Sequence, residues 1–225
     1  MYSNAVHPFL ASPHLASGRF PLDKNIRRQV QDKSGLNPKL VLMKLMLQKG
    51  TVIWMLGLSG AGKSTISNLL EAQLQTENIF SIQLDGDELR KGLNKNLGFS
   101  MEDRAENIRR AAETARIMAE KGIVVICSFI TPLNAHRTIA REILGEMYFE
   151  VFIDCPLSVC QQRDVKGLYK MAGNNTLKNF TGISSAFEKP ENADLVLLTE
   201  DQTPQQCCDH LYAAVSSRVT SLQLT

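Results

Sequence analysis

A glycine-rich stretch that follows a short apolar run constrains the fold of this chain more than any other feature. Residues 57–64 read GLSGAGKS and match the pattern G-x-x-x-x-G-K-[ST] at every fixed position, directly after the apolar residues 52–56. Glycines let the backbone turn so that successive N–H groups point inward, and a helix that begins at Lys63 adds the positive end of its dipole. The stretch predicts a strand, a phosphate-binding loop and a helix, with a plain glycine-rich turn as the weaker alternative.

The residue types of this loop indicate its ligand. The lysine of such a loop reaches the β- and γ-phosphates of a nucleoside triphosphate, and the hydroxyl that follows it holds Mg²⁺. We therefore expect ATP and Mg²⁺ as cofactors, with Lys63 at the phosphates and Ser64 at the metal. The predicted ATP-binding residues of the loop are Gly57, Leu58, Ser59, Gly60, Ala61, Gly62, Lys63, Ser64 and Thr65.

The composition narrows the classes of protein to which the chain can belong. A net charge of +2 with 21% charged residues is too balanced to indicate nucleic-acid or membrane binding, so neither is expected as a partner. The 44% of hydrophobic residues suffices for the core of one globular domain. No apolar stretch approaches the ~20 residues that cross a bilayer. The five cysteines form no C-x-x-C pair, which fits a soluble protein of a reducing compartment.

The first 48 residues are expected to form an extension ahead of a domain that covers residues 49–225. Residues 1–22 contain no Asp or Glu, which is typical of a disordered tail and, weakly, of an organelle transit segment. The cytoplasm and an organelle interior therefore both stay open as locations. Asn37 and Pro38 predict the start of a basic amphipathic helix. That helix either packs on the following domain or binds a membrane surface or a partner.

From Thr51 onward the pattern alternates between strands and helices. The run Ile123–Ile126 is continuously apolar, which indicates a strand buried on both faces and hence a parallel sheet between helices. We therefore predict an α/β fold with helices on both faces of the sheet. The predicted strands cover residues 51–57, 80–85, 123–128, 148–154 and 194–199, and the predicted helices cover residues 63–74, 101–121, 133–144, 156–163 and 204–217.

Two carboxylates follow the second predicted strand. In a parallel sheet, ligands lie beyond the carboxyl ends of the strands, so we expect Asp85 and Asp87 to face the phosphate loop. Asp87 could take a proton from an acceptor hydroxyl, and Asp85 could order the water shell of the metal. An Asp-Gly turn followed by a helix cap is the alternative interpretation of the same residues.

Three further segments carry side chains suited to anions. Arg104 and Asn107 lie three residues apart on a helix that Ser100 is expected to cap, and they either bind a second anion or are solvated. Ser128 lies at the end of the third predicted strand. Three roles are open for it: a phosphate ligand, a transient nucleophile or a hydrogen-bonding turn residue. Residues 162–190 are long and polar for a simple connection, and they predict either a mobile lid that closes over phosphate or a solvated loop. The cations of this lid segment are Arg163, Lys166, Lys170 and Lys178.

These motifs, in this order, resemble the adenylylsulfate kinase (adenosine 5′-phosphosulfate kinase) family. The resemblance covers residues 49 to about 200. Besides the phosphate loop, it rests on LDGDELRKGLN at 84–94, GF at 98–99, EDRAENIRR at 102–110, SFI at 128–130, DVKGLYK at 164–170 and KNFTGI at 178–183.

The resemblance implies a P-loop kinase that transfers the γ-phosphoryl group of MgATP to the 3′-hydroxyl of adenosine 5′-phosphosulfate (APS), making PAPS in sulfate activation. It implies Asp87, Lys63 and Ser128 as catalytic residues, with Asp87 as the base and Ser128 at the position traditionally assigned a phosphoserine intermediate. Arg163 joins the ATP-binding residues. The implied APS-binding residues are Asp87, Glu88, Leu89, Arg90, Phe99, Arg104, Asn107, Ile130, Thr131, Lys166, Lys178, Asn179 and Phe180.

Two departures from the family pattern bear on the activity. Glu88 stands where the family usually has Asn, and residues 170–178 lack an Arg and a Glu that are usual in the lid. The alternatives to sulfate activation are a related small-metabolite kinase and a catalytically weak or silent nucleotide-binding module that regulates an ATP sulfurylase partner. The resemblance also suggests a homodimer.

Overall fold

The computed structural model of the protein describes residues 48–173 and 180–219. Five parallel strands form one sheet in the order β2-β3-β1-β4-β5. The predicted parallel sheet is confirmed, and each strand lies within one residue of its predicted bounds. The strands are β1 (Thr51–Leu56), β2 (Ser81–Asp85), β3 (Val124–Ser128), β4 (Tyr148–Asp154) and β5 (Leu195–Leu198).

The central strand β1 explains the continuous apolar runs. Ile53 lies opposite Ile126 of β3 on one side and Phe149 of β4 on the other. All six residues of β1 are buried, because neighbouring strands flank it and helices cover both of its faces. The five cysteines are buried as well, with free thiols.

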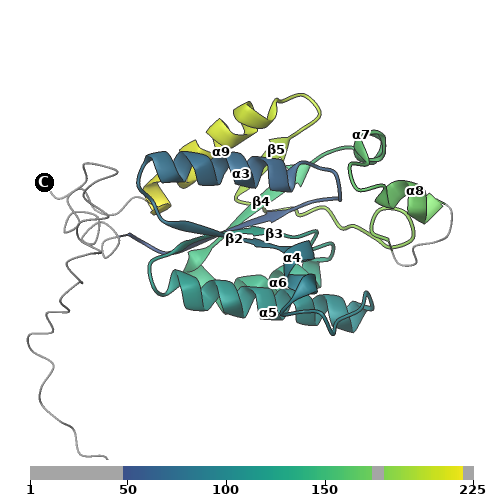
Figure 1. The fold of residues 1–225 in the computed structure, drawn as a ribbon, viewed down its shortest axis with the longest axis horizontal. Helices are drawn as coiled ribbons and strands as arrows, with labels where there is room; N and C mark the ends of the chain where they lie inside the picture. Colours follow the sequence, from purple (N-terminus) through teal and green to yellow (C-terminus); the bar gives the residue numbers. More distant parts are fainter. Residues whose placement is uncertain (1–47, 174–179, 220–225) are drawn as a thin grey trace, which may run out of the picture. The chain divides into compact units, whose positions relative to one another are not determined.

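Helices cover both faces of the sheet (Figure 1). The helices α3 (Lys63–Thr76) and α9 (Pro204–Val219) pack on one face. The helices α5 (Met101–Ala119) and α6 (Asn134–Leu144) pack on the other. A further helix, α7 (Leu157–Arg163), follows β4. All five begin within one residue of the predicted position, so the predicted two-sided packing is confirmed.

Two short helices were not predicted as helices. Asp85, for which the sequence predicts either an Asp-Gly turn or a carboxylate near the metal, is the cap of α4 (Gly86–Lys91), since its Oδ1 accepts from the backbone N–H of Asp87 at 2.8 Å. The carboxylate of Asp164 accepts from two backbone N–H groups of α8 (Leu168–Gly173). Both helices have six residues, too few to show a helical period in the sequence. A 3₁₀ turn (Gly145–Met147) also precedes β4.

The start of α5 is tied to the loop before it. The Oγ of Ser100 accepts from the N–H of Asp103 at 3.1 Å, which confirms the predicted cap. The carboxylate of Asp103 does not return to Ser100, and instead accepts from the N–H of Gly98 at 3.0 Å. The loop that carries Phe99 is therefore attached to a rigid helix.

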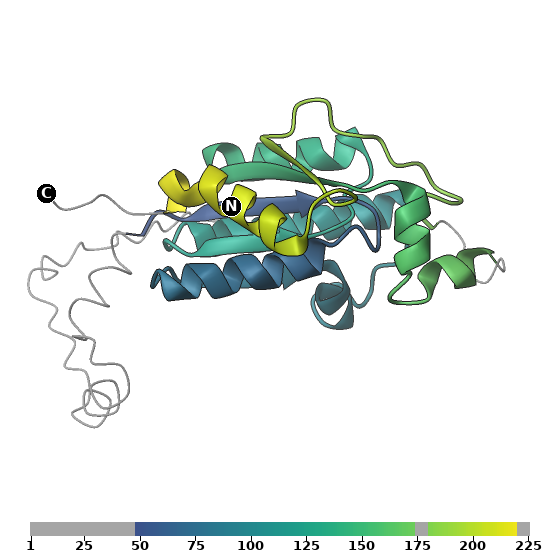
Figure 2. The same cartoon turned by 90° about the horizontal axis from the view of Figure 1, so that it is seen from above.

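The parallel strands bring their carboxyl ends to one edge of the sheet. The loop after β1, the helix α4 after β2 and the residues after β3 meet at this edge, and α7 and α8 lie beyond it (Figures 1 and 2). Nearly all of the N-terminal extension lies outside the described residues. Within residues 48–173 and 180–219, no helix has the length and apolar character needed to cross a membrane.

Candidate active site

The loop between β1 and α3 has a backbone shape that depends on its glycines. Gly57, Gly60 and Gly62 have φ values of 149°, 76° and 110°, which residues with a side chain rarely adopt. A Cβ at Gly57 would also lie 2.6 Å from the carbonyl oxygen of Ile153 on β4. Gly62 is the N-cap of α3 and provides no side-chain cap, so the first N–H groups of the helix remain for a phosphate.

A cavity of about 470 Å³ opens beside this loop. Its wall combines the loop, the carboxyl ends of β2 and β3, and residues of α5, α7 and α8. Eighteen of the predicted site residues line it: Ser59, Gly60, Ala61, Gly62, Lys63, Ser64, Thr65, Asp85, Asp87, Arg90, Phe99, Arg104, Asn107, Ser128, Ile130, Thr131, Arg163 and Lys166.

Lys63 lies against the phosphate loop. Its Nζ donates to the carbonyl oxygens of Gly57 at 2.9 Å and Leu58 at 2.8 Å. Burial lowers the pKa of Lys63 to about 8, and the charge of Lys166 acts in the same direction. An anionic phosphate next to Nζ would favour the charged amine again, so the binding of phosphate and the protonation of Lys63 are coupled.

Ser64 and Asp85 together provide oxygen ligands at the start of α3. The Oγ of Ser64 donates to Oδ2 of Asp85 at 3.3 Å. A hydroxyl and a carboxylate are ligand types that Mg²⁺ prefers, and this ion ordinarily binds through one or two carboxylates plus substrate phosphates. The pair therefore fits the predicted metal. No group of three or more His, Cys, Asp or Glu within the described ranges is arranged to hold a metal ion.

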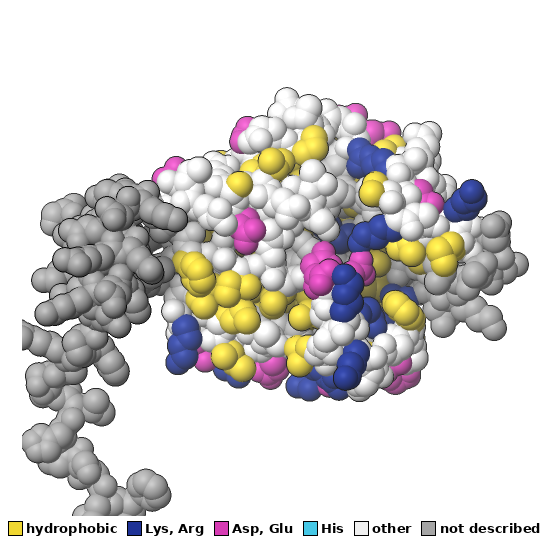
Figure 3. Space-filling view, in the orientation of Figure 1, with side chains coloured by type: hydrophobic (Ala, Val, Ile, Leu, Met, Phe, Trp, Pro, Cys, Tyr) yellow, Lys and Arg dark blue, Asp and Glu magenta, His cyan; other side chains and the backbone are white. Residues whose placement is uncertain are grey.

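Asp87 lies within electrostatic reach of both ends of the cavity. Its charge raises the pKa of Lys63 in the loop and that of Arg90 on α4, opposing the burial of each. It forms an ion pair with Lys166, and this hydrogen bond raises the pKa of Lys166. Lys and Arg side chains gather at the end of the molecule that carries α4, α7 and α8 (Figure 3).

Phe99 and two arginines form another part of the cavity wall. The guanidinium carbons of Arg90 and Arg104 lie 4.4 and 5.7 Å from the centroid of the Phe99 ring. Arg90 donates to the carbonyl of Gly98 at 2.9 Å, and Arg104 donates to that of Phe99 at 3.1 Å. The Phe99 side of this wall is open, since the residue is 56% exposed. We call these residues the acceptor wall, because a planar, anionic ligand matches an aromatic ring flanked by cations.

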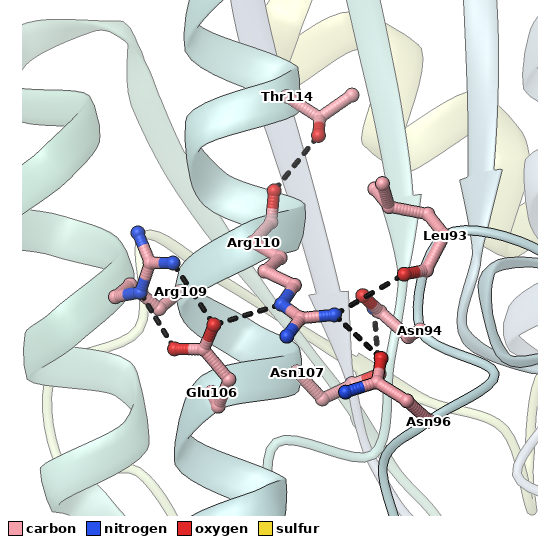
Figure 4. A network of polar contacts seen from close by, with 8 residues as sticks. All are labelled: Leu93, Asn94, Asn96, Glu106, Asn107, Arg109, Arg110 and Thr114. Atoms are coloured by element: carbon pink, nitrogen blue, oxygen red, sulfur yellow. Dashed lines mark hydrogen bonds and ion pairs between the residues drawn. The ribbon is translucent and has the colours of Figure 1, made fainter.

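A polar network fixes the orientation of Asn107 beside the acceptor wall (Figure 4). Asn94 donates to Oδ1 of Asn107 at 3.0 Å, so the NH₂ group of Asn107 remains for a ligand. Arg110 donates to Oδ1 of Asn96 at 2.8 Å and to Glu106 at 2.7 Å. These contacts hold the loop before α5 against the helix. Asn107 is thus positioned as a donor to an anion.

The residues after β3 form the third side of the cavity. Ser128 is buried, and its Oγ has no hydrogen-bond partner among the described residues. Thr131 has a φ of 40°, which is unusual for a β-branched residue. Trp54 donates to its Oγ1 at 2.9 Å, and Arg137 donates to its carbonyl at 3.1 Å. Such strain persists where the surroundings determine the conformation, and it is typical of ligand sites.

Several predicted residues do not line the cavity. Gly57 and Leu58 shape the loop from behind, and Leu89 is half-buried in α4. Glu88 is exposed and paired with Lys91 at 2.6 Å. Phe180 packs edge-on against Tyr169, with ring centroids 5.0 Å apart. Their roles as ligand contacts stay predictions. Lys178 and Asn179 lie outside the described residues.

The cavity is also lined by Tyr169 and His136, which were not among the predicted site residues, and Arg163 makes a contact that the sequence did not indicate. Tyr169 donates from its hydroxyl to the carbonyl of Ser59 at 2.9 Å, which connects α8 to the phosphate loop. Arg163 donates to the carbonyl of Thr199 at 2.6 Å, which connects α7 to the segment after β5. His136 of α6 lines the cavity as well. The partners of Tyr169 and Arg163 are distant in the sequence, so no local pattern could indicate these two contacts. For Tyr169 as a cavity residue, the run DVKGLYK was the available signal.

The fold and the cavity define a P-loop kinase. The central strand leads into a complete phosphate loop for a phosphoryl donor, and the same cavity is lined by Phe99, Arg90 and Arg104. A sugar kinase from Janibacter, 20% identical, shares this fold with a TM-score of 0.54, and the match covers 74% of this chain and 94% of that one.

More specifically, the chain belongs to the adenylylsulphate kinase family, whose model matches residues 49–198. The adenylyl-sulfate kinase of Clostridium acetobutylicum is 49% identical over 75% of this chain and 84% of that protein. The bifunctional enzyme NodQ of Rhizobium tropici is 47% identical over 89% of this chain, which is 32% of NodQ. The APS kinase of Mycobacterium tuberculosis, solved in complex with AMPPNP and APS, is 42% identical with a TM-score of 0.73, over 75% of this chain and 98% of that one. The predicted family, fold class and enzyme class are confirmed.

Proposed function

We propose that this kinase transfers the γ-phosphoryl group of MgATP to the 3′-hydroxyl of APS, producing PAPS and ADP. One observation carries the proposal: a single cavity joins a phosphate loop to a wall of Phe99, Arg90 and Arg104, with Asp87 in electrostatic reach of both. The relatives support it, since the family model and the relatives' names describe the same activity. Neither alternative function has a comparable observation in its favour.

The donor half of the cavity suits ATP. Backbone N–H groups of the loop and the start of α3 would bind the phosphates, and Lys63 would turn from the loop carbonyls to the β- and γ-phosphates. Arg163 would contact the nucleotide from α7. Ser64 and Asp85 would hold Mg²⁺, which supplies charge neutralisation at the phosphates.

The transfer step needs a base at the acceptor hydroxyl. Asp87 would accept the 3′-hydroxyl proton while the bond from O3′ to the γ-phosphorus forms and the bond to the β,γ-bridging oxygen breaks. ADP then leaves with that bridging oxygen. Lys166, which pairs with Asp87, would turn to the transferring phosphoryl group as negative charge shifts. Phe99 would stack on the adenine of APS, and Arg104 and Asn107 would bind its phosphosulfate.

Ser128 is assigned a hydrogen bond and no covalent step. Its Oγ is buried at the cavity and lacks a partner among the described residues, so an oxygen of a bound ligand would complete its hydrogen bonding. A loose phosphoryl-transfer transition state is stabilised by positioning and charge, and needs no intermediate nucleophile.

ADP release by the purified chain tests the proposal. The measurement compares MgATP alone with MgATP plus APS, for the wild-type chain, for Asp87→Asn and for Asp209→Asn, an exposed carboxylate on α9. We expect APS-dependent release in the wild-type chain and a fall in kcat of about 10²–10⁴-fold in Asp87→Asn, the usual contribution of a positioned base. MgATP binding should persist in both variants.

Two results would contradict this assignment. Wild-type chain that binds MgATP without APS-dependent ADP release would leave the silent binding module or another acceptor as the function. Equal turnover in Asp87→Asn and Asp209→Asn would exclude Asp87 as the base, while leaving the substrate intact.

The oligomeric state, the protein partner and the role of the N-terminal extension are proposals as well. We expect a homodimer and, as a partner, an ATP sulfurylase, for which light scattering and co-purification are the tests. Residues 1–48 are proposed to lie outside the kinase domain, and deleting them should leave APS-dependent turnover unchanged. A higher rate after the deletion would instead assign the extension an inhibitory role.

A further inference from the structure

One polar side chain at the acceptor end of the cavity has no part in the reaction as described so far. His136 lies in the first turn of α6 and lines the cavity, as do Arg104, Asn107 and Thr131. It is 3% exposed, and its Nδ1 makes no hydrogen bond with any described residue. A buried nitrogen of a cavity-lining residue that no described residue satisfies is a candidate ligand contact.

Half of the unsatisfied side-chain atoms of the described residues belong to residues that line this cavity. Leaving a buried polar atom unpaired costs about 1–3 kcal/mol, so native structures contain few. Within the described ranges, four buried side-chain atoms lack a partner: Oγ of Ser81, Oδ1 of Asn94, Oγ of Ser128 and Nδ1 of His136. The last two belong to residues that line the cavity. A bound molecule is therefore the natural partner of both.

The charges around His136 indicate which kind of ligand atom it meets. Arg104 acts on it from α5 and Arg137 from α6, and Glu188 is the acidic group that faces it. The Glu188 carboxylate already accepts from the N–H of Asn134 at 2.6 Å. Burial, followed by the two arginines, lowers the pKa of His136, so its ring is neutral at pH 7. A neutral ring among arginines can donate an N–H to an oxyanion.

We propose that His136 binds the acceptor through a hydrogen bond from Nδ1 to an oxygen of its sulfate or phosphate group. This assignment rests on the proposed function, since it takes APS as the acceptor. Arg104 supplies charge to the same region, and His136 adds a donor without adding charge. The residue thus sets the affinity for the acceptor and has no effect on the affinity for MgATP.

Steady-state kinetics on three variants test this. His136→Leu removes the donor at similar size, His136→Asn keeps an N–H donor near the position of Nδ1, and His210→Leu alters an exposed histidine on α9 as the matched control. We expect His136→Leu to raise the KM for APS about tenfold, the effect of a lost hydrogen bond to a charged group. The KM for MgATP and kcat should change less than twofold. His136→Asn should recover most of the loss, and His210→Leu should match the wild-type chain.

Calorimetric binding then identifies the oxygen. APS, adenosine 5′-phosphate and adenosine are titrated into wild-type chain and His136→Leu. Weakening for APS alone assigns the sulfate oxygens, and weakening for both APS and adenosine 5′-phosphate assigns the phosphate oxygens. Equal weakening for adenosine would place His136 at the nucleoside and overturn the proposal.

A readout on the wild-type chain guards against a folding defect in the variants. The ring-nitrogen NMR shifts of His136, assigned with His136→Asn, should move on addition of APS and stay in place with MgATP alone. Unmoved shifts, or an unchanged KM for APS in a folded His136→Leu, would overturn the His136 assignment while wild-type turnover upholds the proposed function. Absence of wild-type turnover would contradict the proposed function itself.

Discussion

The two ends of the cavity differ in the groups that form them, which are backbone N–H groups at the donor end and side chains at the acceptor end. The donor end is formed mainly by the backbone. Glycines with positive φ and the N-terminus of α3 provide N–H groups directly after the buried strand β1. At the acceptor end, side chains of the acceptor wall and of the residues after β3 line the cavity, and Phe99 is 56% exposed. One end is continuous in the sequence, and the other is assembled from separate segments.

The difference predicts different responses to mutation. A change in the donor loop should alter the path of the backbone and so affect every phosphate contact together. A change in the acceptor wall should remove one contact and leave the rest, because each side chain is held by its own partners. Kinetics can separate these cases, since one should act through MgATP and the other through APS.

The largest effect is expected for Gly57→Ala. The φ of 149° and a Cβ 2.6 Å from the carbonyl of Ile153 force the strand or the loop to move. We expect the free energy of unfolding to fall by about 1–3 kcal/mol, and kcat/KM for MgATP to fall about 10²-fold through the displaced phosphate contacts. Gly173→Ala is the control, because a Cβ there meets no atom within 4 Å. Equal behaviour of the two variants would refute a backbone-built donor end.

The next effect should come from Arg104→Gln at the acceptor end. Arg104 lies beside Phe99, donates to its carbonyl and donates to Thr181 at 3.1 Å. Arg104→Gln should also remove the charge-assisted hydrogen bonds that Arg104 is proposed to make with APS. This loss should raise the KM for APS by about 10–100-fold, with the KM for MgATP unchanged. Arg109→Gln, on the exposed face of the same helix, is the matched control. A parallel rise in both KM values would mean that the two ends are not independent.

The same contrast determines what the sequence could reveal. The donor loop is a contiguous pattern, so Gly57 to Thr65 were predicted from residue types alone, and buried strands such as β1 were visible as apolar runs. The residue types of the acceptor wall alone did not determine its role. Only the family resemblance predicted that these residues bind APS. The helices α4 and α8 have only six residues each, too few for a helical period of apolar residues to appear in the sequence, so they could not be predicted. Contacts such as that between Tyr169 and Ser59, 110 residues apart, depend on tertiary packing.

A smaller effect, in pH, should appear at the donor end alone. In the proposed function Lys63 binds phosphate in its charged form, and burial lowers its pKa to about 8 in the free protein. The charged form is lost as pH rises through this value, so kcat/KM for MgATP should fall about tenfold per pH unit above it. Bound phosphates raise the pKa, so kcat at saturation should persist to higher pH. Lys63→Arg should abolish this fall of kcat/KM at high pH, because arginine stays charged. A flat profile in the wild-type chain would contradict the assignment.

The smallest effect should follow Tyr169→Phe, which tests the link between the ends. The hydroxyl of Tyr169 donates to the carbonyl of Ser59 at 2.9 Å, so α8, which follows Lys166 in the chain, is held to the donor loop. Removing one neutral hydrogen bond should cost about 0.5–1.5 kcal/mol.

On the proposal that residues 162–190 form a lid over both substrates, that loss should lower kcat/KM for MgATP and for APS alike, by about two- to tenfold. Tyr212→Phe, a partly buried tyrosine on α9 outside the cavity, should have no effect on either value. A change confined to MgATP would mean that Tyr169 merely supports the phosphate loop. A change confined to APS would place the lid with the acceptor wall and leave the donor end rigid by itself.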